Sequence, residues 1–240
     1  MGYENEARAV YTQAQNGEEI DNRMDAQFNR CEFVFTKKPA YDFFKRAFDI
    51  ICSLFALVIL FPVMLIVVLI VALSDGQGHP FFVQKRTGRN GKEFKLIKLR
   101  TMKLNAECEL ENLQHKNEMD GPVFKIQDDP RITKLGKFLR KFGFDEVPQL
   151  LNILTGSMSF VGPRPPLPKE VEQYSTYDRA RLLVKPGLTC YWQVSPKRNS
   201  VSFKEWMELD RKYIAERSFL LDIKLIFLTA IRVIVKHDGC

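Results

Sequence analysis

Residues 50–73 read IICSLFALVILFPVMLIVVLIVAL, a run of 24 residues without a charged side chain. As one α-helix this run would exceed the roughly 30 Å hydrocarbon core of a bilayer, so the sequence predicts a membrane element. Pro62 divides the run into two halves of about 18 Å each. A helix break at this proline would let the chain return to the side from which it entered.

Basic residues flank the apolar run on both sides. Lys45 and Arg46 precede it, and Lys85, Arg86 and Arg89 follow it. A single spanning helix usually concentrates such charge on its cytoplasmic side, so charge at both ends favours a re-entrant hairpin. The alternative is one straight spanning helix with a kink at the proline, and the residues alone leave both interpretations open.

The remainder of the 240-residue chain is long enough for one globular domain. The apolar run is too long for the core of a signal peptide and no cleavage site follows it, so we expect it to be retained. We divide the chain into a polar N-terminal segment (1–38) that is poorly ordered or peripheral, a membrane segment (39–76) and a catalytic domain (77–240). The five cysteines form no CxxC pair, which argues against a disulfide framework or a zinc site and favours a cytoplasmic domain.

The formal net charge of +7 is unevenly distributed. Residues 81–104 carry eight Lys or Arg and one acid, Glu93, whereas residues 105–129 carry seven acids and two bases. Blocks of this kind attract the phosphates of lipids, nucleotides or nucleic acids, or they simply solvate a surface.

The periodicity predicts a mainly helical α+β fold. Two strands, 81–83 and 94–99, should pair across the Gly-rich turn 88–91. The expected helices are 105–117, 132–142 and 146–154. The proline-rich stretch 162–168 fits neither a helix nor a central strand, so we expect a rigid loop there.

The C-terminal stretch 218–236 is apolar, but Asp222, Lys224 and Arg232 interrupt it, so it cannot easily span a membrane. At helical spacing its polar residues form one stripe and its apolar residues a broad face. Such a helix either lies in the membrane interface or packs into the core of the domain, and the sequence leaves both open.

The adjacent acids Asp145 and Glu146 form the most informative polar pair. Pro148 fits only the first turn of the following helix, which predicts that Asp145 is its N-cap. A carboxylate held ionised at a helix N-terminus suits a nucleophile or a magnesium ligand. Arg140 and Arg164 lie nearby in the sequence, and guanidiniums around carboxylates predict an anionic substrate bound with a divalent cation.

Seven ordered motifs between Tyr41 and the C-terminus resemble the bacterial sugar transferase family, the monotopic polyprenyl-phosphate phosphoglycosyl transferases. They are Lys45-Arg46-Ala-Phe-Asp49, Phe82-Val-Gln-Lys-Arg86-Thr-Gly88, Lys98-Leu-Arg100-Thr-Met102, Asp129-Pro-Arg131-Ile-Thr-Lys-Leu-Gly136, Asp145-Glu146-Val-Pro148-Gln149-Leu, Val161-Gly-Pro-Arg164-Pro165, and Lys185-Pro186-Gly187-Leu-Thr with Trp192-Gln193-Val194. Seven motifs in order are far more specific than any one of them.

The resemblance implies transfer of a hexose-1-phosphate from a nucleoside diphosphate sugar, usually a UDP-sugar, to polyprenyl (undecaprenyl) phosphate, with release of UMP. This is the initiating step of cell-surface polysaccharide or glycoconjugate synthesis. In the family the aspartate that matches Asp145 forms a covalent aspartyl-phosphosugar intermediate. The resemblance also implies a bacterial inner-membrane protein whose catalytic domain lies on the cytoplasmic face, with a small β-hairpin and interfacial amphipathic helices.

Site residues carry over position by position. Asp145 and Glu146 would be catalytic and would bind Mg²⁺, with Mn²⁺ as an alternative. Arg140 and Arg164 match family arginines that hold phosphate, and Lys98 and Arg100 are weaker candidates. The family has a re-entrant helix hairpin, in which Lys45, Arg46 and Asp49 would anchor the first half and Pro62 would form the break. The expected partners are the sugar nucleotide, polyprenyl phosphate and membrane lipid, not nucleic acid; a homodimer is left open.

The chain departs from the family pattern at several positions. Phe61 replaces a common serine before the hairpin proline, which removes a hydroxyl that would bind the carbonyl freed at the break. Gly143-Phe144 replaces Ser-Leu or Thr-Leu before the acidic pair, and Cys190 and Pro196 replace common glycines. We expect altered substrate contacts and retained activity.

Two rival functions come from other classes. In a non-catalytic membrane scaffold the acidic pair would only cap a helix, and Asp145→Asn would leave function intact. A membrane-tethered nucleic-acid binder would use the basic stretch 81–104, but the acids that follow it and the absence of a recognition module argue against this reading.

Overall fold

The computed structural model describes residues 35–74, 79–126, 128–195 and 201–233. Most of the predicted N-terminal segment 1–38 therefore lies outside the described residues. The elements, in chain order, are α3 (Pro39–Leu73), β1 (Phe81–Thr87), η2 (Arg89–Gly91), β2 (Glu93–Leu99), η3 (Glu111–Lys116), α4 (Lys134–Lys141), η4 (Phe144–Glu146), α5 (Gln149–Thr155), β3 (Ser159–Val161), α6 (Pro168–Glu172), α7 (Thr176–Arg179), η5 (Ala180–Leu183), β4 (Gly187–Thr189), α8 (Tyr191–Val194), α9 (Phe203–Glu216) and α10 (Phe219–Ile231). The predicted mainly helical α+β class is confirmed.

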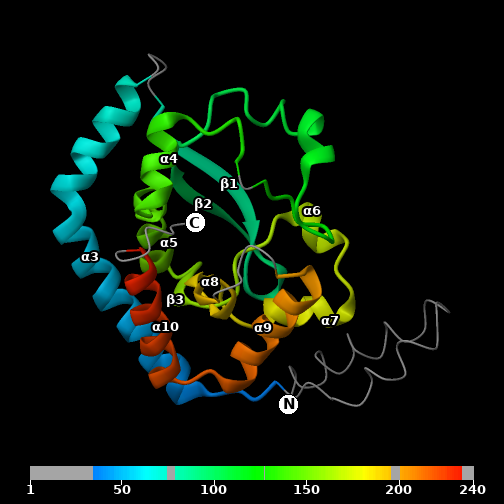
Figure 1. The fold of residues 1–240 in the computed structure, drawn as a ribbon. Coiled ribbons are helices and arrows are strands. Elements are labelled where there is room, and N and C mark those ends of the chain that lie inside the picture. Colours follow the sequence, from blue (N-terminus) through cyan, green and yellow to red (C-terminus); the bar gives the residue numbers. More distant parts are fainter. Residues whose placement is uncertain (1–34, 75–78, 127, 196–200, 234–240) are drawn as a thin grey trace.

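The apolar run forms the long helix α3, which begins with Pro39 in its first turn, where a missing amide proton does no harm. The helix continues through Pro62. Figure 1 shows that α3 curves along one side of the domain. A proline inside a helix removes one backbone hydrogen bond and permits such a bend. Within the described residues, α3 is the single helix long and apolar enough to cross a membrane, and little of its apolar stretch is buried.

Both halves of α3 pack against the same domain. Leu57 and Leu60, before the proline, lie against a cluster that contains Ile153 of α5. Val71, near the far end, is buried with Leu99 of β2 and Leu139 of α4. Helix α3 is therefore part of the packing of the domain at both ends.

The β-hairpin predicted for strands 81–83 and 94–99 is confirmed. β1 and β2 pair antiparallel, from Phe81 opposite Leu99 to Thr87 opposite Glu93. The turn contains two consecutive residues with positive φ, Asn90 (58°) and Gly91 (74°), a conformation that Asn and Gly tolerate best.

A second sheet was not predicted. β3 and β4 pair in parallel over three residues each. A Cβ on Gly187 would lie only 2.1 Å from the Gly162 nitrogen, so the close approach of the two segments requires glycine there. Strands this short carry no readable alternation, which explains why the sequence did not indicate them.

The predicted helix 132–142 is confirmed with α4 at Lys134–Lys141, but the predicted helix 105–117 is wrong. That stretch forms turns and the short 3₁₀ helix η3. The Asn117 side chain bonds the backbone of Met119, Val123 and Lys125. Local side-chain bonds of this kind compete with helix formation.

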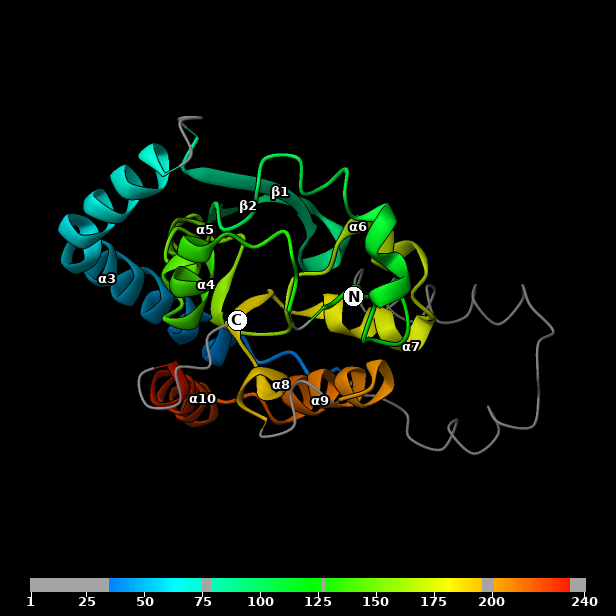
Figure 2. The same ribbon diagram turned by 45° about the horizontal axis from the view of Figure 1, so that its top comes forward.

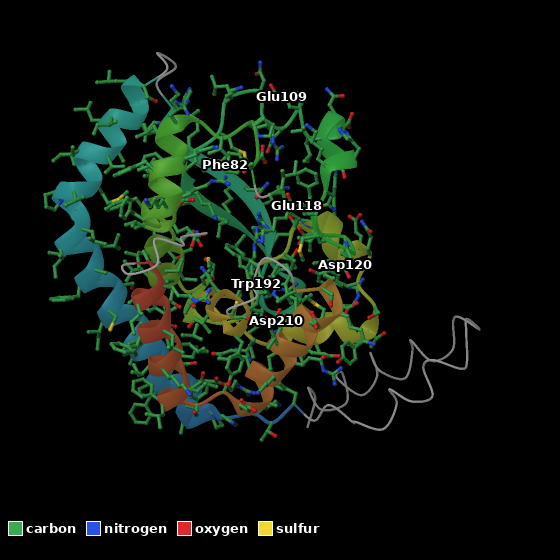
Figure 3. All side chains as sticks on the ribbon, viewed as in Figure 1. Phe82, Glu109, Glu118, Asp120, Trp192 and Asp210 are labelled. Carbon is green, nitrogen blue, oxygen red and sulfur yellow. The ribbon has the colours of Figure 1, made fainter. Side chains whose placement is uncertain are left out.

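Helices α8, α9 and α10 lie along the side of the domain opposite the β1–β2 hairpin (Figure 2). Trp192 of α8 stacks on Trp206 of α9, with ring centroids 4.4 Å apart. The loop that carries Asp120 reaches the start of α9 (Figure 3), where the Asp120 carboxylate accepts a 2.6 Å hydrogen bond from the Phe203 amide. These contacts close the core beside the proline-rich loop.

Helix α10 places its polar stripe inward and much of its apolar face outward. Asp222 and Arg232 are buried, and Thr229 bonds Thr189 of β4. Leu220 is 80% exposed and Phe227 65% exposed. A helix on the surface of a water-soluble domain buries its apolar residues and exposes its polar ones. Helix α10 does the opposite, which is typical of a helix that faces lipid.

Candidate active site

Asp145 lies in the single turn η4, between α4 and α5. Its residue is only 3% exposed, and its Oδ1 atom accepts no hydrogen bond from any residue that the structure describes. Gly143, with φ of 69°, turns the chain into η4. A buried oxygen without a donor is energetically costly, so this carboxylate is a strong candidate for a functional group.

The predicted capping role of Asp145 is wrong. Helix α5 begins at Gln149, and Pro148, not Asp145, occupies its N-cap position without a side-chain cap. The 3₁₀ turn Phe144–Glu146 separates Asp145 from the helix that it was expected to cap. Capping therefore does not account for this carboxylate.

Glu146 and Lys98 form a close ion pair beside Asp145. Lys98 Nζ lies 2.6 Å from Glu146 Oε1, and both side chains are largely buried. Lys98 belongs to β2, where it pairs with Phe82 of β1. The sequence-predicted phosphate ligand Lys98 is thus brought to the acidic pair, with its ammonium group on Glu146.

Arg140 approaches the acidic pair from α4. Its Nε donates a 3.0 Å hydrogen bond to Thr101 Oγ1. A Cβ on Gly136 would lie 2.0 Å from the Thr101 carbonyl oxygen, so only glycine lets α4 pack this close to the residue that orients Arg140. Burial lowers the pKa of Arg140, against the raising effects of the Asp145, Asp129 and Glu146 carboxylates.

The pKa of Asp145 is raised to about 6, chiefly because burial disfavours its charged form. The Lys98 ammonium and the Arg140 guanidinium lower this pKa, and the Glu146 carboxylate raises it. At neutral pH Asp145 is therefore ionised but poorly solvated. An ionised carboxylate in this state is suited to nucleophilic attack on a phosphorus atom that cations hold in place.

The proline-rich loop carries Arg164. Its guanidinium lies 5.9 Å from the centre of the Trp206 ring, and its backbone carbonyl accepts a 3.0 Å hydrogen bond from Arg181. The positive charge of Arg164 lowers the pKa of Arg140, so the two predicted phosphate ligands lie within electrostatic reach of each other.

Arg86 is a site candidate that the sequence reasoning did not select. It is buried on β1 and donates a 3.0 Å hydrogen bond to the Pro165 carbonyl. Burial and the charge of Arg164 lower its pKa to about 10, and Glu146 opposes this shift. Alternation along β1 could have found it, because Phe82, Gln84 and Arg86 share the inward face.

Arg100 lies elsewhere. Its Nη2 donates a 3.3 Å hydrogen bond to the Val71 carbonyl at the end of α3. The structure thus ties Arg100 to the end of α3.

The predicted anchor residues join α3 to the domain. Lys45 Nζ lies 2.6 Å from Asp222 Oδ2, and Arg46 donates hydrogen bonds of 2.7 and 2.8 Å to the Ile153 and Leu154 carbonyls. Asp49 accepts hydrogen bonds from the Ser159 hydroxyl and the Phe160 amide, each 3.1 Å long. Their predicted role at the membrane surface stays a prediction.

A divalent cation would be held by Asp145 and Glu146. Within the described residues no cluster of three or more His, Cys, Asp or Glu side chains could hold a metal. Mg²⁺, however, is usually bound by one or two carboxylates together with substrate phosphates. The acidic pair, with its unpartnered Asp145 oxygen, fits that mode.

Comparison with known proteins identifies the family. Residues 40–236 match the model of the bacterial sugar transferases. The chain belongs to this family. It is 46% identical over 166 residues to galactosyl transferase CpsE of Streptococcus agalactiae. The aligned residues cover 69% of this chain and 36% of CpsE. It is 41% identical over 196 residues to the exopolysaccharide production protein ExoY of Sinorhizobium fredii, covering 80% and 86% of the two chains.

A third relative carries a name that specifies a reaction. The undecaprenyl-phosphate galactose phosphotransferase of Salmonella typhimurium is 40% identical over 206 residues, which cover 84% of this chain and 42% of the relative. The chain thus spans less than half the length of two of these relatives and most of the length of ExoY. The matched region of this sugar transferase contains all but the first residue of α3, the acidic pair and the proline-rich loop.

Proposed function

We propose that this protein transfers a hexose-1-phosphate from a nucleoside diphosphate sugar, most simply a UDP-sugar, to polyprenyl phosphate. Family membership and the Salmonella relative's name support the reaction class. The observation that carries the proposal is the Asp145 carboxylate, which is buried beside cations and has an oxygen that no described residue bonds. The name of ExoY specifies exopolysaccharide production, and production of an extracellular or cell-surface polysaccharide is the process we infer for this protein.

The proposed chemistry has two displacement steps. An Asp145 carboxylate oxygen attacks the phosphorus bonded to the sugar, and the bond from that phosphorus to the nucleoside monophosphate oxygen breaks. The nucleoside monophosphate leaves with the electron pair, and the phosphosugar stays on Asp145. An oxygen of polyprenyl phosphate then attacks the same phosphorus and releases the Asp145 carboxylate.

The surrounding residues supply positioning and charge. Arg140, held by Thr101, and Arg164, held by its prolines, would bind phosphate oxygens and offset the charge that two anions bring together. Lys98 keeps Glu146 in place and favours the ionised form of Asp145. Arg86 adds a further positive charge from β1.

Asp145 and Glu146 would hold Mg²⁺ or Mn²⁺, and the cation would supply positive charge that stabilises the leaving phosphate. Two carboxylates cannot approach a diphosphate closely without a compensating cation. We therefore expect excess EDTA to abolish turnover and added Mg²⁺ to restore it. Full turnover in EDTA would contradict this assignment.

We also propose that α3 enters and leaves the membrane on the cytoplasmic side. The support is that Arg46 near its start and Val71 near its end both contact the same domain, and that α10 directs apolar residues outward. In a background without native cysteines, cysteines placed at Lys37 and at Ser74 should react with a membrane-impermeant reagent from the same face. Labelling from opposite faces would exclude re-entry.

A trapped intermediate tests the mechanism. Incubated with the correct sugar nucleotide and no lipid acceptor, the protein should gain the mass of a hexose phosphate on Asp145 and release about one equivalent of nucleoside monophosphate. Added polyprenyl phosphate should remove the adduct. Asp145→Asn should form none, whereas Glu146→Gln should retain partial labelling. A label on another residue, or product formation without any adduct, would show that the assigned nucleophile is wrong.

A further inference from the structure

The proline-rich loop is held in place through its backbone carbonyls. Three of the four residues 163–166 are prolines, which have no amide proton, so the loop offers few donors of its own. Each of these four successive carbonyls accepts a hydrogen bond from a different residue. The donors are the Gly187 amide to Pro163, the Arg181 side chain to Arg164, the Arg86 side chain to Pro165 and the Thr87 amide to Pro166, at 2.9, 3.0, 3.0 and 2.9 Å. The backbone of Arg164, the predicted phosphate ligand, is thus held by Arg181.

Arg181 joins three parts of the domain with one guanidinium. It lies in η5 and is buried. Its Nη2 atom donates to the Arg164 carbonyl and lies 2.8 Å from Asp210 Oδ2, and its Nη1 atom donates a 2.8 Å hydrogen bond to the Tyr174 hydroxyl. The planar, rigid fork of the guanidinium makes these contacts in one fixed geometry. A shift of the Arg181 side chain would therefore move the Arg164 backbone.

Helix α9 supplies the counter-charge of Arg181. Asp210 lies on α9 (Figure 3), one turn after Trp206, and residues four apart share one face of a helix. A capping box between Ser202 and Glu205 fixes the first turn of this helix. Both Trp206 and Asp210 are buried. The buried face of α9 thus presents an aromatic ring and a carboxylate at a fixed separation.

The Trp206 ring lies near two guanidiniums. The central carbon of Arg164 lies 5.9 Å from the ring centre and that of Arg181 lies 5.3 Å from it. Two cations near one ring repel each other unless one of them is neutralised. Burial raises the pKa of Asp210 to about 6 while Arg181 lowers it, so Asp210 is ionised at neutral pH. Arg181 is thereby balanced within the protein, and the charge of Arg164 stays available to an anionic substrate.

Stability alone does not account for this ion pair. A buried ion pair stabilises a fold no better than well-packed apolar side chains of similar size. Among the described residues, Asp210 Oδ1 and Arg181 Nε have no hydrogen-bond partner, so the pair is also incompletely satisfied. Its bond to the Arg164 carbonyl, by contrast, gives the pair a role at the site.

We propose that Arg181 and Asp210 form a positioning pair, which holds the backbone of Arg164 so that its guanidinium stays where a substrate phosphate binds. Both residues are buried, so the pair acts through Arg164 and does not touch the substrate. A cation fixed in advance spares the reaction the cost of reorganising it. This inference rests on the proposed function, because it takes Arg164 to bind a phosphate.

The double substitution Arg181→Met with Asp210→Leu tests the proposal, because it removes the pair without leaving one buried charge unpaired. We expect a melting temperature close to that of wild type. The second-order rate constant for Asp145 labelling by the sugar nucleotide should fall by about 10- to 100-fold, since a misplacement of about 1 Å has an effect of that order. Tyr174→Phe is the matched control, because it removes a bond to the same guanidinium and leaves the bond to Arg164. It should label within about twofold of wild type.

A double-mutant cycle with Arg164→Ala separates positioning from a merely structural role. If the pair acts only through Arg164, adding the double substitution to Arg164→Ala should slow labelling by less than about twofold further. An equal fold loss in both backgrounds would overturn the proposal, and so would labelling at the wild-type rate by the pair variant. Should the pair variant not fold, Asp210→Asn, which keeps the shape of the side chain and removes its charge, enters the same cycle with the same expectation.

Binding of UDP, measured by calorimetry, tests the pair even if the wild type forms no covalent adduct. UDP carries the diphosphate of the proposed donor, so it should meet the same arginine. The pair variant and Arg164→Ala should each bind UDP about tenfold more weakly than wild type, as loss of one charge-assisted contact would. Tyr174→Phe should bind it like wild type. Equal UDP affinity in the wild type and the pair variant would refute the positioning role, whereas a missing adduct with weakened UDP binding would refute the reaction alone.

Discussion

Asp145 and Asp222 are both 3% exposed, yet their surroundings differ in kind. The Asp222 carboxylate accepts hydrogen bonds from Tyr41, Lys45 and Tyr213, at 2.7, 2.6 and 2.8 Å. Asp145 has one oxygen that no described residue bonds, although cations lie nearby. A buried carboxylate with all its bonds made serves the fold, whereas one left incomplete is available to a substrate.

Asp145→Asn tests directly whether Asp145 differs from Asp222, and we expect it to have the largest effect. We expect activity to fall on the order of 10³-fold or more, because an amide is a poor nucleophile. The melting temperature at pH 7 should equal or exceed that of wild type, because folding buries an ionised carboxylate without full compensation. Assays of sugar-phosphate transfer and thermal unfolding in detergent measure the two effects.

The sign of the pH dependence follows from the raised pKa of Asp145. Because the folded value, about 6, lies above the ordinary value of 3.8, the folded state binds the proton more tightly, and wild type loses stability as pH rises between these values. The stability advantage of Asp145→Asn should therefore shrink as pH falls toward 4. If Asp145→Asn instead destabilises the protein at pH 7, then Asp145 is a structural carboxylate.

Asp222→Ala should have the opposite profile. Removing the carboxylate leaves Lys45 buried without its partner, which should cost about 3 kcal/mol of unfolding free energy. Asp128→Ala is a matched control because its side chain is 93% exposed, and it should change stability by less than about 0.5 kcal/mol. Lys45→Met in the Asp222→Ala background should recover part of the loss. Stability equal to wild type would remove the basis for calling Asp222 structural.

Lys98→Met should shift the pH dependence of activity. The reaction needs ionised Asp145, so the rate of Asp145 labelling in wild type should fall as pH drops through about 6. Lys98 makes the largest charge contribution that lowers this pKa. Its loss should move the acid limb to higher pH. Lys95→Met, on the exposed side of the same strand, should leave the limb in place. The profile is best recorded at low Mg²⁺, since a bound cation also lowers the pKa.

Ser159→Ala should have the smallest effect. It removes one of the two hydrogen bonds to Asp49, and the Phe160 amide still donates to the same oxygen. We expect a loss of about 1 kcal/mol in unfolding free energy and unchanged Asp145 labelling. A large loss of labelling would mean that Asp49, a buried carboxylate with its bonds made, does not serve the fold alone, contrary to the comparison.

Local patterns predicted the parts of the fold that local physics decides. Alternation and an Asn-Gly turn indicated the β1–β2 hairpin, and the uncharged run indicated α3. The helix expected over 105–117 failed because Asn117 bonds nearby backbone groups and Arg131 donates to the Ala106 carbonyl. The contact between Arg131 and Ala106 joins residues 25 positions apart, and a contact of that kind leaves no periodic signal.

The candidate site was predictable as a set of residues but not as a geometry. The acidic pair, Arg140 and Lys98 do lie together. The sequence could not show that Asp145 lies within a 3₁₀ turn rather than capping α5, because both conformations suit the same residues. Nor could it separate Arg86, which bonds the proline-rich loop, from Arg100, which bonds the end of α3, since both are strand-end arginines in basic motifs.

The fastening of α3 at both ends has a practical consequence for anyone who wishes to handle this protein without a membrane. Deleting residues up to Ser74 would strip the Ile153 and Leu154 carbonyls of their arginine cap, leave Asp222 without Lys45 and expose the pocket around Leu99 and Leu139 that Val71 fills. Such a truncation should yield an aggregated chain, not a soluble enzyme. Helix α3 is an integral part of the domain, so shortening the protein from its N-terminus should stop before Phe35.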